Sequence, residues 1–286
     1  MTIAVTGAAG HLGRLSIAAL RARGVAPADI VAVVRDAAKA ADLAADGVQV
    51  RVADYGDPAA LREALTGVDK LLLVSGSEVG QRLPQHTNIV DAAKATGVTF
   101  IAYTSVLHAA TSPLLLAGEH KATEDLLAAS GIDHALLRNG WYWENYASAV
   151  GTAAATGTLV GSAGTGRVAG AARADFAEAA AVVLTTDGHA GAAYELGGQR
   201  LTYPELAEVL SGLVGKPVVC QDISKEEYAT ILENAGVPAR FAAVLADSDA
   251  GIAVGALDTD SGDLARLIGR APTPAADALA AVAPAV

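Results

Sequence analysis

The chain has 286 residues, which suits one large α/β unit or two modest domains and is enough to bury a core without disulfide or metal cross-links. Its formal net charge of −11, without clustered Lys and Arg, argues against a surface that binds nucleic acid or an anionic membrane. Cys220 is the single cysteine, and we find neither a signal-peptide pattern nor an apolar run of membrane-spanning length, so we expect a cytoplasmic protein that acts on a small molecule.

Residues 2–13 read as a strand, a glycine-punctuated turn and the start of a helix. Residues 3–5 are apolar, Gly7, Gly10 and Gly13 punctuate the turn, and apolar residues at helical spacing follow. Such a turn brings backbone N–H groups and the positive end of a helix dipole to one point, where a pyrophosphate can bind. Glycine is needed because a Cβ would hold the phosphates off. The G-x-x-G-x-x-G spacing resembles that of the short-chain dehydrogenase branch of Rossmann proteins and predicts a dinucleotide site, the alternative being an ordinary glycine-rich turn.

Apolar runs alternate with helix-length segments down the first half of the chain. The runs that read as strands cover residues 30–34, 48–52, 70–74, 99–102 and 134–137. Asp57 before Pro58 is typical of a helix start, and Gly97 and Gly131 fall where helices should stop. The repeated βα pattern predicts an α/β fold with a doubly wound parallel sheet of the Rossmann type, in which ligands bind at the carboxyl ends of the strands.

The residues after the second and third predicted strands suit the adenosine part of a dinucleotide. Arg35 stands where NAD-selective Rossmann proteins often place an acid, so it could pair with a 2′-phosphate, and we expect NADPH over NADH. The neighbouring Asp36 weakens this interpretation, and the alternative is a solvated arginine at a helix start. Asp54 and Tyr55 are placed to touch the adenine, although Asp54 reads equally well as a helix cap.

The fourth and fifth predicted strands end in segments that could reach the rest of a cofactor. Residues 75–82, SGSEVGQR, start with small residues that let the chain pass close to a ribose, and Gln81 or Arg82 could reach the nicotinamide side; a plain loop is the alternative. Residues 102–105, AYTS, come where standard short-chain dehydrogenases place a catalytic serine, followed by Tyr-x-x-x-Lys on the next helix. That motif does not occur in this chain, so we do not expect strongly acid-assisted reduction of an ordinary ketone.

The sixth predicted strand leads into a concentration of aromatic residues. The chain has only two Trp, seven Tyr and three Phe, and four of these aromatics lie within residues 141–146. Aromatic faces flank planar ligands well, and the amides of Asn139 and Asn145 could bind a carboxamide or carbonyl. The alternative is a hydrophobic plug that packs a second lobe onto the first.

Beyond Ser148 the pattern predicts a smaller, mainly helical lobe. The elements expected there are strands at 158–160, 167–169 and 193–196, helices at 175–186 and 237–248, and two more helices opened by capping boxes at Thr202/Glu205 and Ser224/Glu227. We expect a nucleotide-binding domain over 1–147 and a substrate-binding lobe over 148–286 that returns a strand near 193–197 to the main sheet. The six histidines lack the spacing of metal ligands, so no metal site is expected.

Several of these motifs occur together over nearly the whole chain. They are the glycine loop, Arg35, SGSEVGQR, AYTS, LLRNGWY at 136–142 and LADSD at 245–249. In this combination the chain resembles the NmrA-like atypical short-chain dehydrogenases, and within that family it is most similar to the bacterial type 2 NAD(P)H:quinone oxidoreductases. The resemblance implies NADPH-dependent hydride transfer to quinones or related conjugated acceptors.

The resemblance also implies which residues form the site. The pyrophosphate would be held by Gly7, Gly10, His11 and Leu12. The implied contacts with NADP(H), with NAD(H) as the alternative cofactor, come from Thr6, Gly7, Ala8, Ala9, Gly10, His11, Leu12, Gly13, Arg35, Asp54, Ser75, Gly76, Ser77, Tyr103, Thr104, Asn139, Gly140 and Trp141. The implied substrate contacts come from Gln81, Val106, Trp141, Tyr142, Trp143 and Asn145. Trp143 departs from the small polar residue expected at its place, which predicts a narrower or differently shaped substrate pocket.

The missing Tyr-x-x-x-Lys motif is consistent with a quinone as hydride acceptor. The hydroquinone anion is stabilised by its own ring, so the protein mainly has to align two rings. The candidates for a proton donor are Tyr103, Tyr142 and His120. Two alternatives remain, a reductase of triphenylmethane dyes and a non-catalytic NADP(H)-binding sensor with a protein partner, both represented among NmrA-like proteins. A homo-oligomer is compatible with the sequence, which names neither the oligomeric state nor the natural acceptor.

Overall fold

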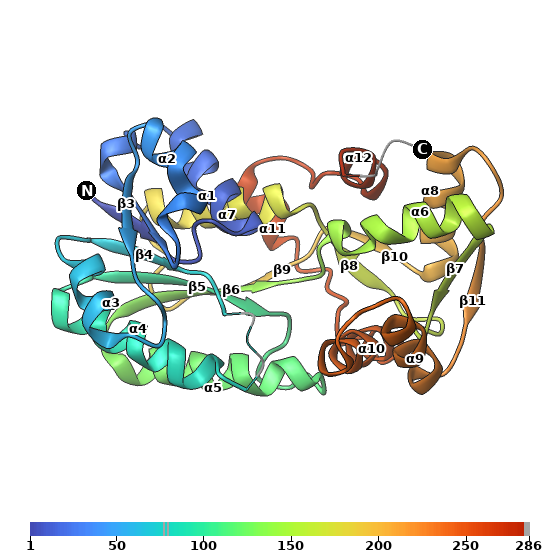
Figure 1. The fold of residues 1–286 in the computed structure, drawn as a ribbon. Coiled ribbons are helices and arrows are strands. Elements are labelled where there is room, and N and C mark those ends of the chain that lie inside the picture. The colour runs from blue at the N-terminus through green and yellow to red at the C-terminus, as the bar shows by residue number, and fades with distance from the viewer. Residues whose placement is uncertain (77, 79, 283–286) are drawn as a thin grey trace. The chain divides into compact units, whose positions relative to one another are not determined.

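The largest sheet of the molecule has seven strands. The computed structural model describes residues 1–76, 78 and 80–282. In spatial order the strands are β3 (Gln49–Val52), β2 (Ile30–Val34), β1 (Ile3–Val5), β4 (Lys70–Leu73), β5 (Phe100–Val106), β6 (Asp133–Asn139) and β9 (Ala193–Leu196). β1 pairs in parallel with both β2 and β4, and β2–β3 and β4–β5 are parallel as well. The predicted Rossmann-type sheet is confirmed (Figure 1), with its change of strand order at β1 and β4, the place where such sheets bind ligands.

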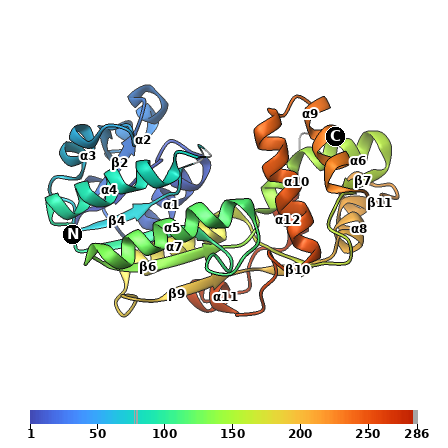
Figure 2. The same ribbon diagram turned by 90° about the horizontal axis from the view of Figure 1, so that it is seen from below.

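Helices cover both faces of this sheet. One face is covered by α3 (Pro58–Leu65), α4 (Arg82–Thr96) and α5 (Leu115–Ser130), and Figure 2 views the sheet from the side of α4 and α5. Apolar side chains of the strands pack there against the helices, for example Leu71 and Ile101 against Leu61, Ile89 and Leu127. The other face is covered by α1 (His11–Ala22) and α7 (Arg173–Thr185), which pack against each other.

Local signals in the sequence place the helix ends correctly. The Asp57 carboxylate accepts hydrogen bonds from the backbone N–H groups of Ala59 and Ala60, both at 3.0 Å, so Asp57 caps α3. Gly97 ends α4 at a φ of 80°, a left-handed conformation that favours glycine. The shorter helices near the sheet are η1 (Pro27–Asp29), η2 (Ala37–Ala40) and α2 (Ala41–Ala45).

The chain forms two compact units, each built from several segments. The first unit comprises Met1–Val106, Glu119–Arg138 and Arg173–Tyr194, and the second comprises Leu107–Gly118, Asn139–Ala172 and the described residues from Glu195 onward. The helix predicted at 175–186 is present as α7, but it belongs to the first unit, because its small alanine-rich surface packs on α1. The strand expected near 193–197 does return to the main sheet as β9. The division between residues 147 and 148 stays a prediction about independently folding parts.

The second unit contains helices and two small sheets. The strands are β7 (Thr158–Gly161) paired with β11 (Val219–Asp222), and β8 (Val168–Gly170) paired with β10 (Gln199–Leu201). The helices are η3 (Trp143–Tyr146), α6 (Ala147–Thr156), α8 (Tyr203–Val214), α9 (Lys225–Asn234), α10 (Ala239–Ala253), α11 (Asp263–Ile268) and α12 (Ala275–Ala280). Both predicted capping boxes are present, at the starts of α8 and α9. In the described part of the chain, no helix has the length and apolarity needed to cross a membrane.

A buried carboxylate lies in the interior of the second unit. Asp249 of α10 accepts hydrogen bonds from the backbone N–H of Ser162, from the Ser162 hydroxyl at 3.3 Å and from the Tyr203 hydroxyl. Burial raises the pKa of Asp249 to about 6. A Cβ on Gly161 would lie 2.8 Å from the Asp249 carboxylate and against the Tyr203 ring, so only glycine fits at the end of β7.

Candidate cofactor site

The glycine loop joins β1 to α1, and it has no room for a side chain at Gly13. Gly7 has a φ of +58°, and a Cβ on Gly13 would lie 2.7 Å from the Cα of Ala8 and against the carbonyl oxygen of Gly7. The loop is held to the sheet by a hydrogen bond from the Ala8 N–H to the Val33 carbonyl at 3.2 Å. Gly10 is the N-cap of α1, and no described side chain caps this helix end. The first N–H groups of α1 are therefore left to bind an anion.

A cavity of about 390 Å³ opens beside this loop, at the carboxyl ends of β1 to β4. Several residues predicted to bind the cofactor line it, namely Gly7, Ala9, Gly10, His11, Leu12, Gly13, Arg35, Asp54, Ser75 and Gly76. Thr6 and Ala8 are buried behind the lining; the Thr6 hydroxyl donates to the Leu72 carbonyl at 3.2 Å and accepts from the Val74 N–H at 3.0 Å. Ser77 lies outside the described residues. The cavity's size and its glycine floor fit the adenosine and pyrophosphate portions of a dinucleotide.

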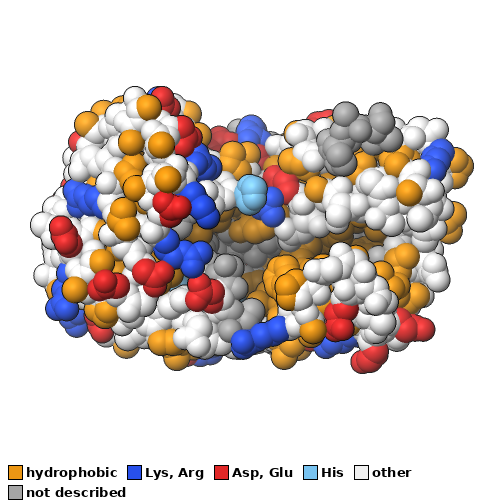
Figure 3. Space-filling model, viewed as in Figure 1, with side chains coloured by type: hydrophobic (Ala, Val, Ile, Leu, Met, Phe, Trp, Pro, Cys, Tyr) orange, Lys and Arg blue, Asp and Glu red, His pale blue; other side chains and the backbone are white. Residues whose placement is uncertain are grey.

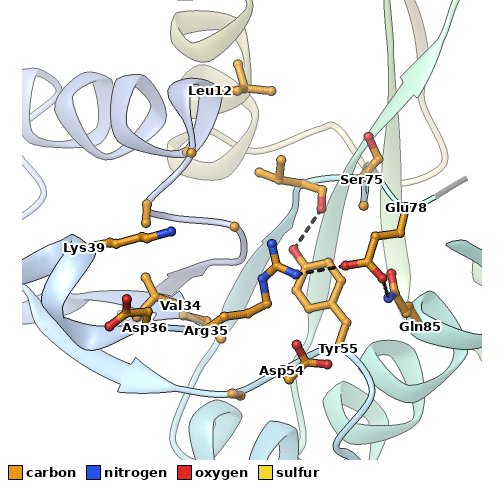
Figure 4. A pocket seen from close by; sticks show the side chains of 18 of the residues that line it. Leu12, Val34, Arg35, Asp36, Lys39, Asp54, Tyr55, Ser75, Glu78 and Gln85 are labelled. Carbon is orange, nitrogen blue, oxygen red and sulfur yellow. Dashed lines mark hydrogen bonds and ion pairs between the residues drawn. The ribbon is translucent and has the colours of Figure 1, made fainter. Parts of the chain in front are cut away.

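Two cationic side chains face this cavity. Arg35 follows β2, and Lys39 stands four residues later on η2 (Figure 4). The Asp36 carboxylate accepts from the Ala38 N–H at 3.0 Å and so serves as the N-cap of η2. The Asp36 carboxylate next to Arg35 is thus used in local structure and does not pair with Arg35. The Arg35 guanidinium instead lies 2.9 Å from the Glu78 carboxylate at the cavity. Lys39 was not predicted as a site residue. The short helix η2 that follows β2 places Lys39 at the same cavity as Arg35, and no signal in the sequence indicated this helix.

Asp54 and Tyr55 both follow β3, but they serve different purposes. Asp54 accepts from the Gly56 N–H at 2.7 Å within the turn before α3, and it lines the cavity as well. The helix cap that was the alternative interpretation of Asp54 is provided by Asp57 instead. The Tyr55 hydroxyl donates to the Val74 carbonyl at 3.0 Å, and burial raises the pKa of Tyr55 to about 12. The neutral Tyr55 ring therefore forms part of the cavity wall (Figure 4).

The start of the loop after β4 is fixed by buried polar groups of α4. The Gly76 carbonyl accepts two hydrogen bonds from Arg82, at 3.1 and 2.9 Å, and the Gly76 N–H donates to Nε2 of His86 at 3.1 Å. Arg82 is only 4% exposed and forms an ion pair with Glu119 at 2.8 Å. Arg82 is thus engaged in holding the loop, whereas Gln81 is exposed at the N-terminus of α4.

The protonation of His86 follows from its partners. Because Nε2 accepts from the Gly76 N–H, the ring proton must be on Nδ1, which lies 2.9 Å from the Thr123 hydroxyl. Thr123 in turn donates to the Glu119 carbonyl at 3.1 Å. Burial and the neighbouring Arg82 lower the pKa of His86 to about 3, so the ring is neutral and the chain of hydrogen bonds is intact at neutral pH.

Two of the three candidate proton donors lie in the interior of the first unit. The Tyr103 hydroxyl is 2.7 Å from Nδ1 of His120, and both residues are buried. Burial raises the pKa of Tyr103 and lowers that of His120, so both are neutral. Thr104 accepts from the Ser75 N–H at 2.9 Å and Val106 is buried near the end of β5. A part for Tyr103 or His120 in proton transfer stays a prediction.

The serine of the AYTS segment takes part in a buried ion pair that sequence reasoning missed. Ser105 donates to Glu124 at 2.6 Å, and Glu124 also accepts from Nε and Nη2 of Arg138, at 3.0 and 2.7 Å. The three residues come from β5, α5 and β6, so the pair joins three elements of the first unit. Their separation along the chain left no local signal for it.

The aromatic segment belongs to the second unit, where Trp143 is fully buried. Its indole packs against Gly170, where an added Cβ would lie 2.6 Å from the ring, and against Tyr146. Asn139 is 5% exposed; its amide nitrogen lies 3.5 Å from the Tyr142 hydroxyl, and its amide oxygen has no partner among the described residues. The remaining members of the segment are Gly140, which is buried, Trp141 and Tyr142, which are half-buried, and Asn145, which is exposed. Substrate contacts from this segment stay predictions.

The glycine loop lies at a helix N-terminus, where the strand order of the parallel sheet changes, and two cations stand after the end of β2. These features define a dinucleotide-binding Rossmann protein. The sequence profile of the NmrA-like family matches residues 1–250, and the chain belongs to this family. The expectation from its motifs is confirmed.

Individual relatives match the chain almost from end to end. Quinone oxidoreductase 2 of Escherichia coli is 52% identical over 278 residues, which cover 97% of each chain. The crystal structure of that NADPH-dependent enzyme with NADPH matches with a TM-score of 0.95 at 51% identity, over 98% of this chain and 99% of the other. The structure of triphenylmethane reductase from Citrobacter sp. with NADP(H) matches with a TM-score of 0.93 at 40% identity, over 98% and 100% of the two chains.

Proposed function

We propose that this protein is an NADPH-dependent oxidoreductase that transfers a hydride to quinones or related conjugated acceptors. The observation that carries the proposal is the 52% identity, over 97% of both chains, to a quinone oxidoreductase. The cavity supports it independently, because its glycine floor and its pair of cations suit a dinucleotide with a 2′-phosphate.

Each part of the site has a proposed task. The N–H groups at the start of α1 bind the pyrophosphate, and Arg35 and Lys39 bind the 2′-phosphate. Arg82 and His86 fix Gly76, so that the loop after β4 keeps its position beside the ribose. When bound, NADPH supplies the hydride.

For proton delivery to the reduced acceptor we favour Tyr142. Tyr103 and His120 direct their polar atoms toward each other inside the first unit, whereas the half-buried Tyr142 hydroxyl lies beside the Asn139 amide. A quinone places little demand on such a donor, because the hydroquinone anion is stabilised by its own ring. This accords with the missing Tyr-x-x-x-Lys motif.

The experiment follows NADPH absorbance on adding a benzoquinone, a naphthoquinone, a triphenylmethane dye or a simple ketone, with NADH in parallel. We expect turnover with the quinones and none with the ketone. Arg35→Ala should raise the KM for NADPH by about ten-fold or more and that for NADH much less, because only NADPH has a 2′-phosphate to lose. Equal effects on both coenzymes would contradict the assignment of Arg35.

A second candidate function is reduction of triphenylmethane dyes. It is favoured by the end-to-end match, at 40% identity, to the Citrobacter sp. reductase. Faster turnover of the dye than of either quinone would establish it. Tight NADPH binding without turnover of any acceptor would instead indicate an NADP(H)-dependent sensor.

Two further expectations accompany the proposed function. A chain with a single cysteine suits the reducing cytoplasm, which cell fractionation would test. We also propose a homo-oligomer, for which light scattering coupled to size exclusion gives the mass directly; a particle of 28.6 kDa would contradict it.

A further inference from the structure

The Arg35 guanidinium already has an anionic partner at the cavity. Its Nη1 lies 2.9 Å from Oε1 of Glu78, and the other carboxylate oxygen of Glu78 accepts from Nε2 of Gln85 at 2.8 Å. In Figure 4 this ion pair extends from the end of β2 to the loop after β4, alongside the Tyr55 ring. A 2′-phosphate that approaches Arg35 therefore meets a carboxylate in the place where it would bind.

Glu78 differs in its contacts from the other carboxylates that line the cavity. Asp36 and Asp54 accept hydrogen bonds from backbone N–H groups of their own turns, those of Ala38 and Gly56. Only Glu78, of the described residues, forms an ion pair with Arg35. Basic and acidic side chains both lie on the face of the first unit that Figure 3 shows. The local pair therefore matters for how the site selects its ligand.

We infer that Glu78 is the internal counter-ion of Arg35 and limits how strongly the site prefers adenine nucleotides with a 2′-phosphate. The inference rests on the proposed binding of NADPH. A 2′-phosphate must displace the Glu78 carboxylate from Arg35 and then stay near it, whereas a ligand with a free 2′-hydroxyl has no anion to offer Arg35 and leaves the pair in place. Glu78 thus weakens the binding of NADPH more than that of NADH.

The test measures binding of two small ligands that differ only in the 2′-phosphate. Calorimetry at low ionic strength would compare adenosine 2′,5′-bisphosphate with AMP on the wild-type protein and on Glu78→Gln, which keeps the side chain's size. The variant should bind the bisphosphate about three- to five-fold more tightly, the range that an exposed ion pair supports, with AMP nearly unchanged. The gain should shrink as salt is added, because both side chains are about half or more exposed.

Two further variants make the result specific. Glu63→Gln removes the same charge from an exposed position of α3 and should leave both affinities unchanged. In an Arg35→Ala background, Glu78→Gln should lose most of its effect on the bisphosphate, because the counter-ion no longer has a partner.

The outcomes separate this inference from the proposed function. If wild-type protein prefers the bisphosphate and Glu78→Gln changes both ligands equally or not at all, the role of Glu78 is wrong and the 2′-phosphate site stands. If the wild-type protein and Glu78→Gln both bind the two ligands with equal affinity, the 2′-phosphate site fails and the inference fails with it. If only Glu78→Gln prefers the bisphosphate, Glu78 is the residue that suppresses the preference, and the inference holds.

Discussion

Each unit of the molecule buries a polar cluster, and the two clusters differ in charge balance. In the first unit, Arg82 and Glu119 form an ion pair, and the neutral His86 completes the hydrogen bonds around Gly76. In the second unit, Asp249 accepts hydrogen bonds from Ser162 and Tyr203, and no described cation pairs with it. The first cluster holds opposite charges side by side, while the second holds an acid among neutral donors.

The difference shows what burial does to a titratable group when its partners differ. Burial and the adjacent Arg82 lower the pKa of His86 to about 3, so His86 stays neutral over the physiological range. Burial raises the pKa of Asp249 to about 6, because neutral donors only partly replace the lost water. The second unit should therefore respond to pH near neutrality through Asp249, while His86 gives the first unit no such response.

The largest effect on stability is expected from removing one member of the ion pair between Arg82 and Glu119. Arg82→Met should lower the free energy of unfolding by about 4 kcal/mol, because Glu119 is left charged without its partner and Gly76 loses two donors. Urea denaturation followed by circular dichroism measures this. Arg62→Met is the matched control. Among the described residues, the exposed Arg62 side chain bonds only a carbonyl of its own helix, at 3.2 Å, so the substitution should change the free energy by about 0.5 kcal/mol or less. Equal effects of the two substitutions would show that the pair contributes nothing.

A somewhat smaller effect is expected from the titration of Asp249. Its pKa is 3.8 in an ordinary environment and about 6 in the folded protein, so the folded state holds the proton more tightly. Stability from this group is complete below pH 4 and is lost as the pH rises through 6, by about 2 to 3 kcal/mol in all. Both tryptophans lie in the second unit, so urea denaturation followed by tryptophan fluorescence at a series of pH values reports on it.

Asp249→Asn should remove this pH dependence, because the amide does not titrate. Asp277→Asn, at an exposed position of α12, is the matched control and should keep the wild-type profile. A wild-type profile that rises between pH 4 and pH 7, after correction for Asp277→Asn, would contradict the raised pKa of Asp249.

A smaller effect on stability is expected from replacing His86, the neutral member of the cluster that contains Arg82 and Glu119. His86→Phe keeps a ring but leaves the Gly76 N–H without an acceptor, which should lower the free energy of unfolding by about 1.5 kcal/mol and weaken NADPH binding. His86→Gln offers a carbonyl oxygen in a similar place and should restore part of the stability and part of the NADPH affinity. Fluorescence titration with NADPH separates the two properties, and full retention of NADPH affinity in His86→Phe would show that Gly76 does not position the cofactor.

The sequence predicted best those features whose cause is local. Gly7 has a left-handed φ that favours glycine, a Cβ on Gly13 would clash with the backbone of the turn, and Asp57 caps a helix within three residues of itself. The centre of the sheet was predictable because strands such as β1 and β2 are apolar runs bounded by turn residues. The glycine loop between β1 and α1 belongs to this class.

The features that the sequence did not predict depend on partners far along the chain. The sequence suggested that Gln81 or Arg82 could reach the nicotinamide side, and it gave no sign that Arg82 pairs inside the first unit with Glu119, 37 positions away. The helix expected at 175–186 was placed in the second lobe because nothing in its alanine-rich sequence identifies α1 as its partner. The ion pair of Arg35 with Glu78 was missed for the same reason, since its members are 43 positions apart.

The smallest expected effect comes from removing one neutral donor from Asp249. Ser162→Ala deletes the hydroxyl at 3.3 Å and keeps the backbone N–H, so the pKa of Asp249 should rise further, by less than one unit, which corresponds to about 1 kcal/mol or less. The midpoint of the pH-dependent loss of stability then moves upward. Ser248→Ala is the control, because the buried Ser248 hydroxyl bonds the Val244 carbonyl of its own helix rather than Asp249. A downward shift of the midpoint in Ser162→Ala would contradict the idea that neutral donors lower the pKa of Asp249. The difference between the two clusters would then need another cause.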